Sequence, residues 1–195
     1  MSINIFYLKS RRALLLPLLC DMIRIGLLSD THGYLDPSLK TFFAECNEIW
    51  HAGDIGNIGL LDELKTWKPV RAVYGNIDGG ILRVECPAEL LLDIEGLRIW
   101  MTHIAGRPGK YARGIDELIL KNKPNLLICG HSHILQVKRD EKYGLLYMNP
   151  GAAGVHGFHK VRTAMRFAIK GGKPCDLDVV ELGDRVPDNS LDTAL

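Results

Sequence analysis

Short apolar runs and helical segments alternate along the first part of the chain, and this order constrains the fold more than any other feature. Strand-like runs cover 23–28, 48–51 and 70–74, and segments with helical spacing of apolar residues, 37–46 and 59–67, lie between them. A strand–helix–strand–helix–strand order requires parallel strands joined by right-handed crossover connections. We therefore predict a parallel core sheet with helices packed against it.

The later part of the chain is dominated by strands. A turn signal at Glu95-Gly96 joins two apolar strands into a predicted hairpin, and an amphipathic helix is expected over 110–121. The remaining strands are expected over 125–129, 135–138, 145–148, 164–169 and 176–182. Both parts fit one α/β domain in which two packed sheets are flanked by helices.

The two ends of the chain differ from this pattern. The apolar run Ala13 to Leu19 is short for a secretion signal, lacks a small-residue cleavage site, and is far below the ~20 residues of a bilayer span. Met22 directly precedes the first strand, so we expect translation to begin there and 1–21 to be an N-terminal extension or an upstream artefact. The folded domain is expected over 22–182, and 183–195 is expected to be a polar tail.

Composition and charge argue against several classes of protein. The chain of 195 residues is 47% hydrophobic with a net charge of +1 and scattered Lys and Arg, which gives no signal for binding nucleic acid or a membrane. The five cysteines are widely spaced and form no Cys-x-x-Cys pair. They indicate a reduced, cytoplasmic compartment rather than a disulfide framework. Exposed edge strands would permit a homodimer.

Five polar clusters follow predicted strands, and each contains residue types that bind metal ions. The carboxyl ends of strands in an α/β sheet face a common crevice, so the clusters are expected to converge although they are far apart in the sequence. Each cluster alone also has an ordinary explanation as a turn or a hydrogen-bonded histidine. The clusters are Asp30-Thr31-His32-Gly33, Gly53-Asp54, Gly75-Asn76-Ile77-Asp78, Thr102-His103 and Gly130-His131-Ser132-His133.

The residue types in these clusters favour transition metals. Carboxylates, an amide and imidazoles form a mixed oxygen and nitrogen set, which suits Mn, Fe, Zn or Co better than calcium. Seven ligands are too many for one tetrahedral ion, but they fit two ions about 3.5–4 Å apart that share a carboxylate. The candidate metal ligands are Asp30, His32, Asp54, Asn76, His103, His131 and His133.

In this order the clusters resemble the calcineurin-like metallophosphoesterases, whose pattern is Asp-x-His, Gly-Asp, Gly-Asn-x-Asp, a lone His and Gly-His-x-His. The small size and the central hairpin resemble the compact YfcE-like phosphodiesterase branch, and the resemblance covers 22–182. It implies a four-layer α/β/β/α sandwich of two mixed sheets flanked by helices. It also implies that one metal is held by Asp30, His32 and His133, a second by Asn76, His103 and His131, and that Asp54 bridges them.

The resemblance further implies a reaction. Two divalent cations, with Mn expected first and Fe, Zn or Ni as alternatives, lower the pKa of a bridging water, and the hydroxide attacks phosphorus in line with the leaving group. Among the ligands, the catalytic residues are expected to be Asp54, Asn76 and His103. Many relatives carry a His where this chain has Ile77, and that His is thought to assist the leaving group. A small phosphodiester is therefore the expected substrate.

Two other interpretations use the same residues. The alternative function is a non-catalytic interaction scaffold on the same fold, as in the retromer subunit that resembles this family. Scaffold relatives tend to lose ligands, whereas this chain has every ligand of the pattern. A nuclease for long nucleic acid would need a basic groove or a capping domain, and the sequence contains neither.

Five residues outside the ligand set have open roles. His51 is expected either to support the ligands or to be a buried histidine bonded to the backbone. Asp78 either orients a ligand or ends a turn, and Asn149 begins a turn near the site with a structural role. His156 and His159 lie in a glycine-broken loop, which we expect to be solvated.

Overall fold

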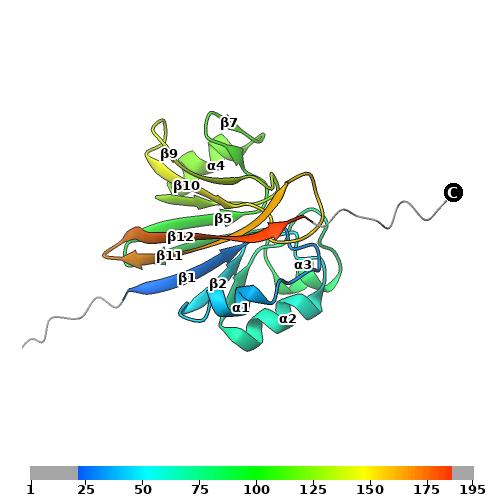
Figure 1. The fold of residues 1–195 in the computed structure, drawn as a ribbon. Coiled ribbons are helices and arrows are strands. Elements are labelled where there is room, and N and C mark those ends of the chain that lie inside the picture. The colour runs from blue at the N-terminus through cyan, green and yellow to red at the C-terminus, as the bar shows by residue number, and fades with distance from the viewer. Residues whose placement is uncertain (1–21, 186–195) are drawn as a thin grey trace, which may run out of the picture.

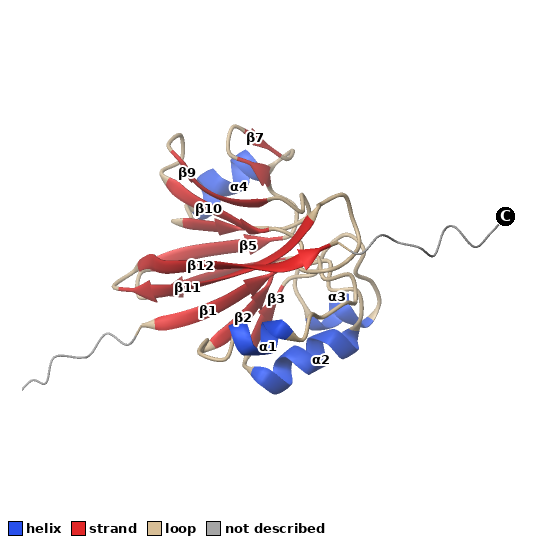
Figure 2. Ribbon diagram, in the orientation of Figure 1, coloured by secondary structure: helices blue, strands red, loops and turns tan. Residues whose placement is uncertain are grey.

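Two mixed five-stranded sheets packed face to face form the centre of the computed structural model, which describes residues 22–185 (Figure 1). Three helices cover the outer face of one sheet and one helix covers the other sheet, as Figure 2 shows. The predicted four-layer α/β/β/α sandwich is therefore confirmed. The helices are α1 (Ser38–Phe42), α2 (Ile58–Trp67) and α3 (Ile81–Glu85) on one side and α4 (Ile115–Asn122) on the other.

The first sheet contains the predicted parallel core. Its strand order is β12-β11-β1-β2-β3, in which β1, β2 and β3 are parallel and β11 and β12 are antiparallel additions at one edge. Crossovers through α1 and α2 make this parallel arrangement possible. The strands are β1 (Ile23–Leu28), β2 (Glu48–His51), β3 (Val70–Ala72), β11 (Val161–Lys170) and β12 (Lys173–Asp184).

The second sheet is built around a second parallel group. Its order is β4-β5-β8-β10-β9, where β5, β8 and β10 are parallel and the edge strands β4 and β9 are antiparallel. The predicted turn joins β4 to β5 with Glu95 and Gly96 both at positive φ, as a tight hairpin requires. The strands are β4 (Glu89–Ile94), β5 (Leu97–Thr102), β8 (Leu126–Ile128), β9 (Leu135–Asp140) and β10 (Leu145–Pro150).

Three apolar layers hold the four structural layers together. The sheets meet through side chains such as Ile25, Leu27 and Trp50 from the first and Ile99 and Ile128 from the second, all fully buried. Separate clusters lie under α1–α3 and under α4. Each large buried side chain contributes about 1.5–3 kcal/mol, so the sandwich is a stable frame for the loops at its edge.

Two predicted helices differ from the structure. The helix expected over 110–121 begins only at Ile115, because a small hairpin of β6 (Gly106–Arg107) and β7 (Lys110–Tyr111) occupies its start. Gly109 adopts positive φ in the turn of this hairpin, and Gly106 adopts positive φ where β6 begins. The helix expected over 37–46 ends at Phe42, where tight turns lead the chain into β2.

The last strand extends beyond the predicted end of the folded domain. β12 continues through Asp184, so Gly183 and Asp184 belong to a strand rather than to the expected tail. The predicted N-terminal extension 1–21 and residues 186–195 lie outside the described residues. Between residues 22 and 185, no helix is long and apolar enough to cross a membrane. The cysteines of this part of the chain are free.

Candidate metal centre

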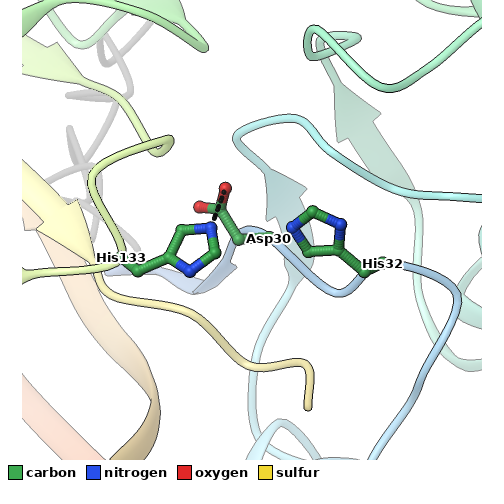
Figure 3. Close-up of side chains that lie close together, drawn as sticks. All are labelled: Asp30, His32 and His133. Carbon is green, nitrogen blue, oxygen red and sulfur yellow. Dashed lines mark ion pairs between the residues drawn. The ribbon is translucent and has the colours of Figure 1, made fainter. Parts of the chain in front are cut away.

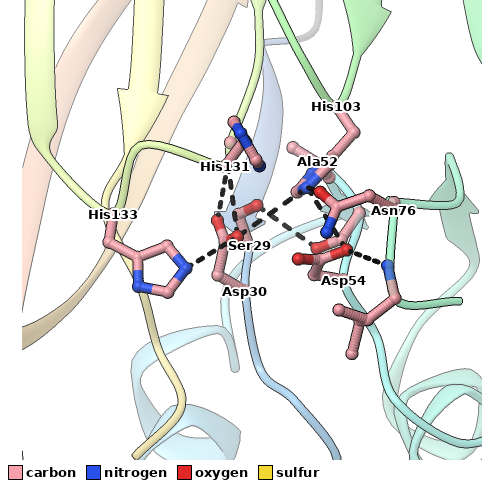
Figure 4. Close-up of polar contacts among 12 residues, drawn as sticks. Ser29, Asp30, Ala52, Asp54, Asn76, His103, His131 and His133 are labelled. Carbon is pink, nitrogen blue, oxygen red and sulfur yellow. Dashed lines mark hydrogen bonds and ion pairs between the residues drawn. The ribbon is translucent and has the colours of Figure 1, made fainter. Parts of the chain in front are cut away.

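The carboxyl ends of β1, β2, β3, β5 and β8 meet at one edge of the sandwich, and the five polar clusters follow these strands. Backbone hydrogen bonds fix the loops to one another. The amide of Asp30 donates to the Gly53 carbonyl at 2.9 Å, and the amide of Gly130 donates to the His103 carbonyl at 3.0 Å. The structure thus brings the expected ligand loops of both sheets together. Figure 4 shows the side chains of six of the seven candidate ligands at this edge.

One group of ligand atoms comes from Asp30, His32 and His133, whose donor atoms all lie within 4.8 Å of one another (Figure 3). His133 Nε2 lies 3.2 Å from Asp30 Oδ1. His32 Nε2 is buried and has no hydrogen-bond partner among the described residues. An unsatisfied buried polar atom costs about 1–3 kcal/mol, so this nitrogen is placed for a ligand other than protein.

A second group comes from Asp54, His103 and His131, again with donor atoms within 4.8 Å of one another. His103 Nε2 lies 3.3 Å from Asp54 Oδ1 and 3.1 Å from Asn76 Oδ1 (Figure 4). The other carboxylate oxygen of Asp54 lies 3.8 Å from His32 Nε2, which belongs to the first group. Asp54 therefore stands between the two groups.

The donor set fits a pair of divalent ions. Each group presents one carboxylate and two imidazoles, and Asn76 adds an amide oxygen to the second group. Mixed nitrogen and oxygen donors of this kind suit first-row transition metals. Two adjacent groups that flank one carboxylate are the arrangement that a two-metal site requires.

Hydrogen bonds orient the ligand side chains. His103 Nδ1 lies 2.8 Å from the Ala52 carbonyl oxygen, so this nitrogen carries the proton and donates. The lone pair of His103 is then on Nε2, the atom that faces Asp54 and Asn76. The carboxylates are oriented by backbone amides: Ile77 donates to Asp54 at 3.0 Å, and His131 donates to Asp30 at 3.0 Å.

The backbone of the site is strained at the ligands themselves. A non-glycine residue at positive φ is uncommon and costs about 1–2 kcal/mol. Such strain persists where the surroundings impose it and gathers at functional sites. The five candidate ligands with φ between 48° and 66° are Asp30, His32, Asp54, His131 and His133.

The charge of the site is balanced between carboxylates and imidazoles. Burial alone would raise the pKa of Asp54, but the hydrogen bond and the charge of the protonated His103 ring outweigh burial, and the pKa is lowered. Burial alone would lower the pKa of His103, but the hydrogen bond that its protonated ring donates to Asp54 and the charges of Asp30 and Asp54 stabilise the charged form and raise this pKa. Burial lowers the pKa of His32, which favours the neutral imidazole that a metal ligand must be.

Asp78 and His51 support the ligand loops. Asp78 is 2% exposed and accepts the amides of Ile55 at 3.0 Å, Gly56 at 2.8 Å and Gly75 at 2.8 Å, so it ties the loop of Asp54 to the loop of Asn76. The sequence left open whether Asp78 orients a ligand or only ends a turn. These bonds show that it does more than end a turn, because it holds the loops that carry two candidate ligands.

His51 combines both of its expected roles. Its ring is fully buried, which lowers its pKa to about 4. The Gly53 amide donates to its Nδ1 at 3.2 Å, and its Nε2 lies 2.9 Å from Thr31 Oγ1, whose hydroxyl donates to the Ile55 carbonyl. His51 thus bonds to the backbone and also joins the loop of Asp30 to the loop of Asp54.

The prediction of a solvated loop is wrong for His159. Its partly buried ring lies with Nδ1 3.2 Å from Nδ1 of His133, and its Nε2 lies 3.0 Å from the Gly154 carbonyl oxygen. His156 is exposed, although its ring centroid is 6.1 Å from that of His32. No motif indicated His159; its position in a glycine-broken loop after the last cluster was the one available signal.

Asn149 is fully buried and has the structural role that we expected. Its side-chain amide donates to the Gly130 carbonyl at 2.8 Å and to Ser132 Oγ at 3.1 Å, which holds the loop of His131 and His133.

A pocket of about 290 Å³ opens over both ligand groups. Side chains of each group line it, and Ile77 and the fully exposed Phe158 form an apolar part of its wall. A concave site with converging polar groups and apolar walls is typical of small-molecule binding.

Comparison with known proteins decides the family. Residues 23–172 match the model of the calcineurin-like phosphoesterase superfamily domain. The chain belongs to this superfamily. Its small single-domain fold agrees with the compact YfcE-like branch. Members of the superfamily use divalent metal ions, in agreement with the two ligand groups described above.

Individual relatives support this assignment. A probable metallophosphoesterase of Methanothermobacter thermautotrophicus is 32% identical over 67% of this chain and 77% of the relative. Vacuolar protein sorting 29 from Cryptosporidium parvum is similar in structure with a TM-score of 0.65 at 20% identity, covering 82% of this chain and 97% of that one. An archaeal phosphodiesterase has a TM-score of 0.63 at 20% identity, covering 81% and 100%. The two structures share the superfamily fold.

Gly75 provides a test of how closely the loops of the metal centre are packed. A Cβ at this position would lie 2.0 Å from Asp54 Oδ1, whereas a Cβ at Gly79 would meet nothing within 4 Å. We expect Gly75→Ala to displace Asp54 and to weaken metal binding by about ten- to a hundredfold, while Gly79→Ala leaves it unchanged. Competition with a fluorescent chelator measures both affinities. Equal affinities in the two variants would show that Gly75 does not position Asp54.

Proposed function

We propose that this protein is a two-metal phosphodiesterase that hydrolyses a small phosphodiester. The observation that supports this most is the position of Asp54, whose two carboxylate oxygens face imidazole nitrogens of two different ligand groups at 3.3 and 3.8 Å. A single carboxylate shared by two such groups favours a dinuclear site over two separate ones.

The proposed ligand assignment follows the two groups. Asp30, His32 and His133 would hold one ion, Asn76, His103 and His131 would hold the other, and Asp54 would serve both. When bound, the two cations supply a hydroxide near neutral pH and neutralise charge on the phosphoryl oxygens.

The chain itself contributes positioning. His103 Nε2 is directed to the site by the Ala52 carbonyl, and Asp54 is kept ionised by its neighbours. Asn76 presents its carbonyl oxygen to His103, which leaves its amide N–H groups as donors toward a phosphoryl oxygen in the pocket. We therefore propose Asp54, Asn76 and His103 as the catalytic residues.

The pocket favours a diester over an alkyl monoester. Every titratable side chain that lines it is a candidate metal ligand, and Ile77 stands where a proton donor would be useful. An expelled alkoxide needs a proton, so a site without an independent general acid suits esters with good leaving groups. Phe158 and Ile77 offer apolar contact to an organic arm of such a substrate.

The test of this function is hydrolysis of bis-p-nitrophenyl phosphate beside p-nitrophenyl phosphate by the metal-free protein supplied with Mn²⁺. We expect metal-dependent cleavage of the diester, with kcat/KM at least about tenfold above that for the monoester. A preference for the monoester would contradict the diesterase proposal. Absence of cleavage of either ester by the metal-loaded protein would favour the scaffold interpretation.

We also propose His159 as a positioning residue for His133. Because His159 Nε2 donates to the Gly154 carbonyl, its Nδ1 accepts a hydrogen bond from the Nδ1–H of His133. The lone pair of His133 is then on Nε2 beside Asp30. His159→Phe is expected to weaken metal binding by about tenfold or more, and His156→Phe at the exposed neighbour is expected to have no effect. Chelator competition measures both. The proposal fails if the two variants bind metal equally well.

Several finer assignments are part of this proposal. Mn²⁺ is the proposed metal, with Fe, Zn and Ni as alternatives that the mixed donor set also accepts. A cytoplasmic location is proposed from the free cysteines in the described part of the chain. A homodimer stays a prediction. The scaffold alternative shares the fold of vacuolar protein sorting 29, and the complete ligand set favours the enzyme.

A further inference from the structure

A second pocket, of about 560 Å³, lies beside the metal-site pocket. Ser132, the residue between the candidate ligands His131 and His133, lines both pockets. Ile134, which directly follows the ligand loop, lines only the second. A molecule whose phosphodiester lies at the metal site can therefore extend past Ser132 into this adjoining pocket.

The adjoining pocket is basic. Arg107 and Lys110, on the β6–β7 hairpin, line it, and no acidic side chain is among its lining residues. Across residues 22–185, neither cation takes part in a salt bridge. Two uncompensated cations at one pocket attract an anionic group, and Arg offers paired N–H donors that match phosphate oxygens.

The hairpin that carries these cations is anchored to the sandwich. The hydroxyl of Tyr147, a residue 1% exposed, donates to the Gly106 carbonyl at 2.7 Å. The hydroxyl of Tyr111 donates to Asp140 at 2.5 Å, and the Ala112 amide donates to the Ala105 carbonyl at 2.9 Å. The backbone of Arg107 and Lys110 is therefore held in place over the pocket.

The other walls suit an organic group. Tyr111, Tyr147, Ile134 and Ala112 give the pocket mainly apolar surfaces, and Gln136 adds a polar amide. A pocket with apolar walls and a few fixed polar groups accommodates an organic moiety and orients its charged end. The combination fits a phosphorylated organic arm better than a bare inorganic ion.

We propose that this pocket binds a second phosphate on one arm of the phosphodiester substrate. The proposal rests on the proposed function, and it adds a substrate class: diesters that carry a further phosphate beyond the scissile one. Arg107 and Lys110 hold that phosphate while the scissile group lies at the metal site.

A matched pair of substrates tests the proposal. Thymidine 5′-(p-nitrophenyl phosphate) and its 3′-phosphorylated form release the same p-nitrophenolate and differ only in the second phosphate. The wild type is expected to cleave the 3′-phosphorylated form with a kcat/KM about tenfold higher. Equal values for the two compounds in the wild type would overturn the proposal.

Variants assign the preference to the pocket. In Arg107→Ala/Lys110→Ala the ratio of the two kcat/KM values is expected to fall to near unity. The control Lys170→Ala/Lys173→Ala removes the same charge at the turn between β11 and β12. This turn lies beside Ile23 at the start of β1, whereas Asp30 of the metal site follows the other end of that strand. It is expected to keep the wild-type ratio. Loss of the ratio in the control as well would indicate a general charge effect and would overturn the proposal.

A binding measurement separates this proposal from the proposed function. Calorimetric titration of the Mn²⁺-loaded protein with thymidine 3′,5′-bisphosphate and thymidine 5′-monophosphate needs no turnover. We expect the wild type to bind the bisphosphate about tenfold more tightly than the monophosphate, and the Arg107→Ala/Lys110→Ala variant to bind both equally. This result would support the phosphate-binding role of the pocket even if no diester is cleaved. Equal affinities of the wild type for the two compounds would overturn the proposed second-phosphate site even if bis-p-nitrophenyl phosphate is cleaved.

Discussion

Asp54→Asn is expected to abolish metal-dependent hydrolysis of bis-p-nitrophenyl phosphate, with kcat/KM reduced by about a thousandfold or more. The carboxylate of Asp54 faces His32 Nε2 at 3.8 Å and His103 Nε2 at 3.3 Å, so one charge is shared by both ligand groups. An amide keeps the size of the side chain but removes that charge. The measurement is steady-state hydrolysis with Mn²⁺ together with the metal content of the purified variant.

The matched control is Asp62→Asn on α2. Asp62 is exposed and, within residues 22–185, forms a salt bridge with Lys65 alone, so the same chemical change there should leave kcat/KM unchanged. Retention of more than about a tenth of wild-type activity by Asp54→Asn would mean that the two groups do not depend on a shared carboxylate.

Asp78→Ala is expected to cost about 3–5 kcal/mol of folding free energy and to weaken metal binding. The substitution leaves the amides of Ile55, Gly56 and Gly75 without their acceptor in a site where Asp78 is 2% exposed. The loops of Asp54 and Asn76 also lose the group that joins them. Denaturant unfolding of the metal-free protein measures the first effect, and chelator competition measures the second.

Asp93→Ala is the comparison for this stability effect. Asp93 also accepts a backbone amide, that of Gly96 at 3.0 Å, but it is exposed near the end of β4, beside the turn into β5. Water can replace its carboxylate, so the expected loss is below about 1 kcal/mol. If Asp78→Ala destabilised the protein as little as Asp93→Ala does, the bracing role of Asp78 would be wrong.

The sequence was sufficient for the parts of the fold that follow from periodicity. Buried runs ending at Leu28, His51 and Ile128 led directly into polar clusters, and the parallel strands place those clusters at one edge. That the loops of Asp30 and Gly130 meet across two sheets followed from the same rule for strand ends.

Other features depend on contacts that no local pattern contains. The β6–β7 hairpin exists because Gly109 turns the chain between the two strands and Tyr147 anchors Gly106 from a distant strand. Amphipathic spacing extended the predicted helix back to Lys110, where the backbone is extended in the structure. α3 is a short helix that was not predicted, since five residues give too little periodicity to recognise.

The finer structure of the site was equally hidden. Positive φ can be anticipated at glycine, yet here it occurs at ligands such as Asp30 and His133, where the surrounding loops impose it. The contact of His159 with His133 joins two loops through their side chains, so only the assembled fold reveals it. Residue types predicted the chemistry, and tertiary contacts determine how those residues are held.

Two metal ions that act together at this loop cluster can be detected by titration of the metal-free protein with Mn²⁺. Activity and the electron paramagnetic resonance spectrum are recorded together during this titration. We predict that hydrolysis of bis-p-nitrophenyl phosphate reaches its maximum at about two equivalents of Mn²⁺ per chain, where the spectrum becomes that of a magnetically coupled pair. Full activity at about one equivalent, with the spectrum of an isolated ion, would contradict a site in which two metal ions act together.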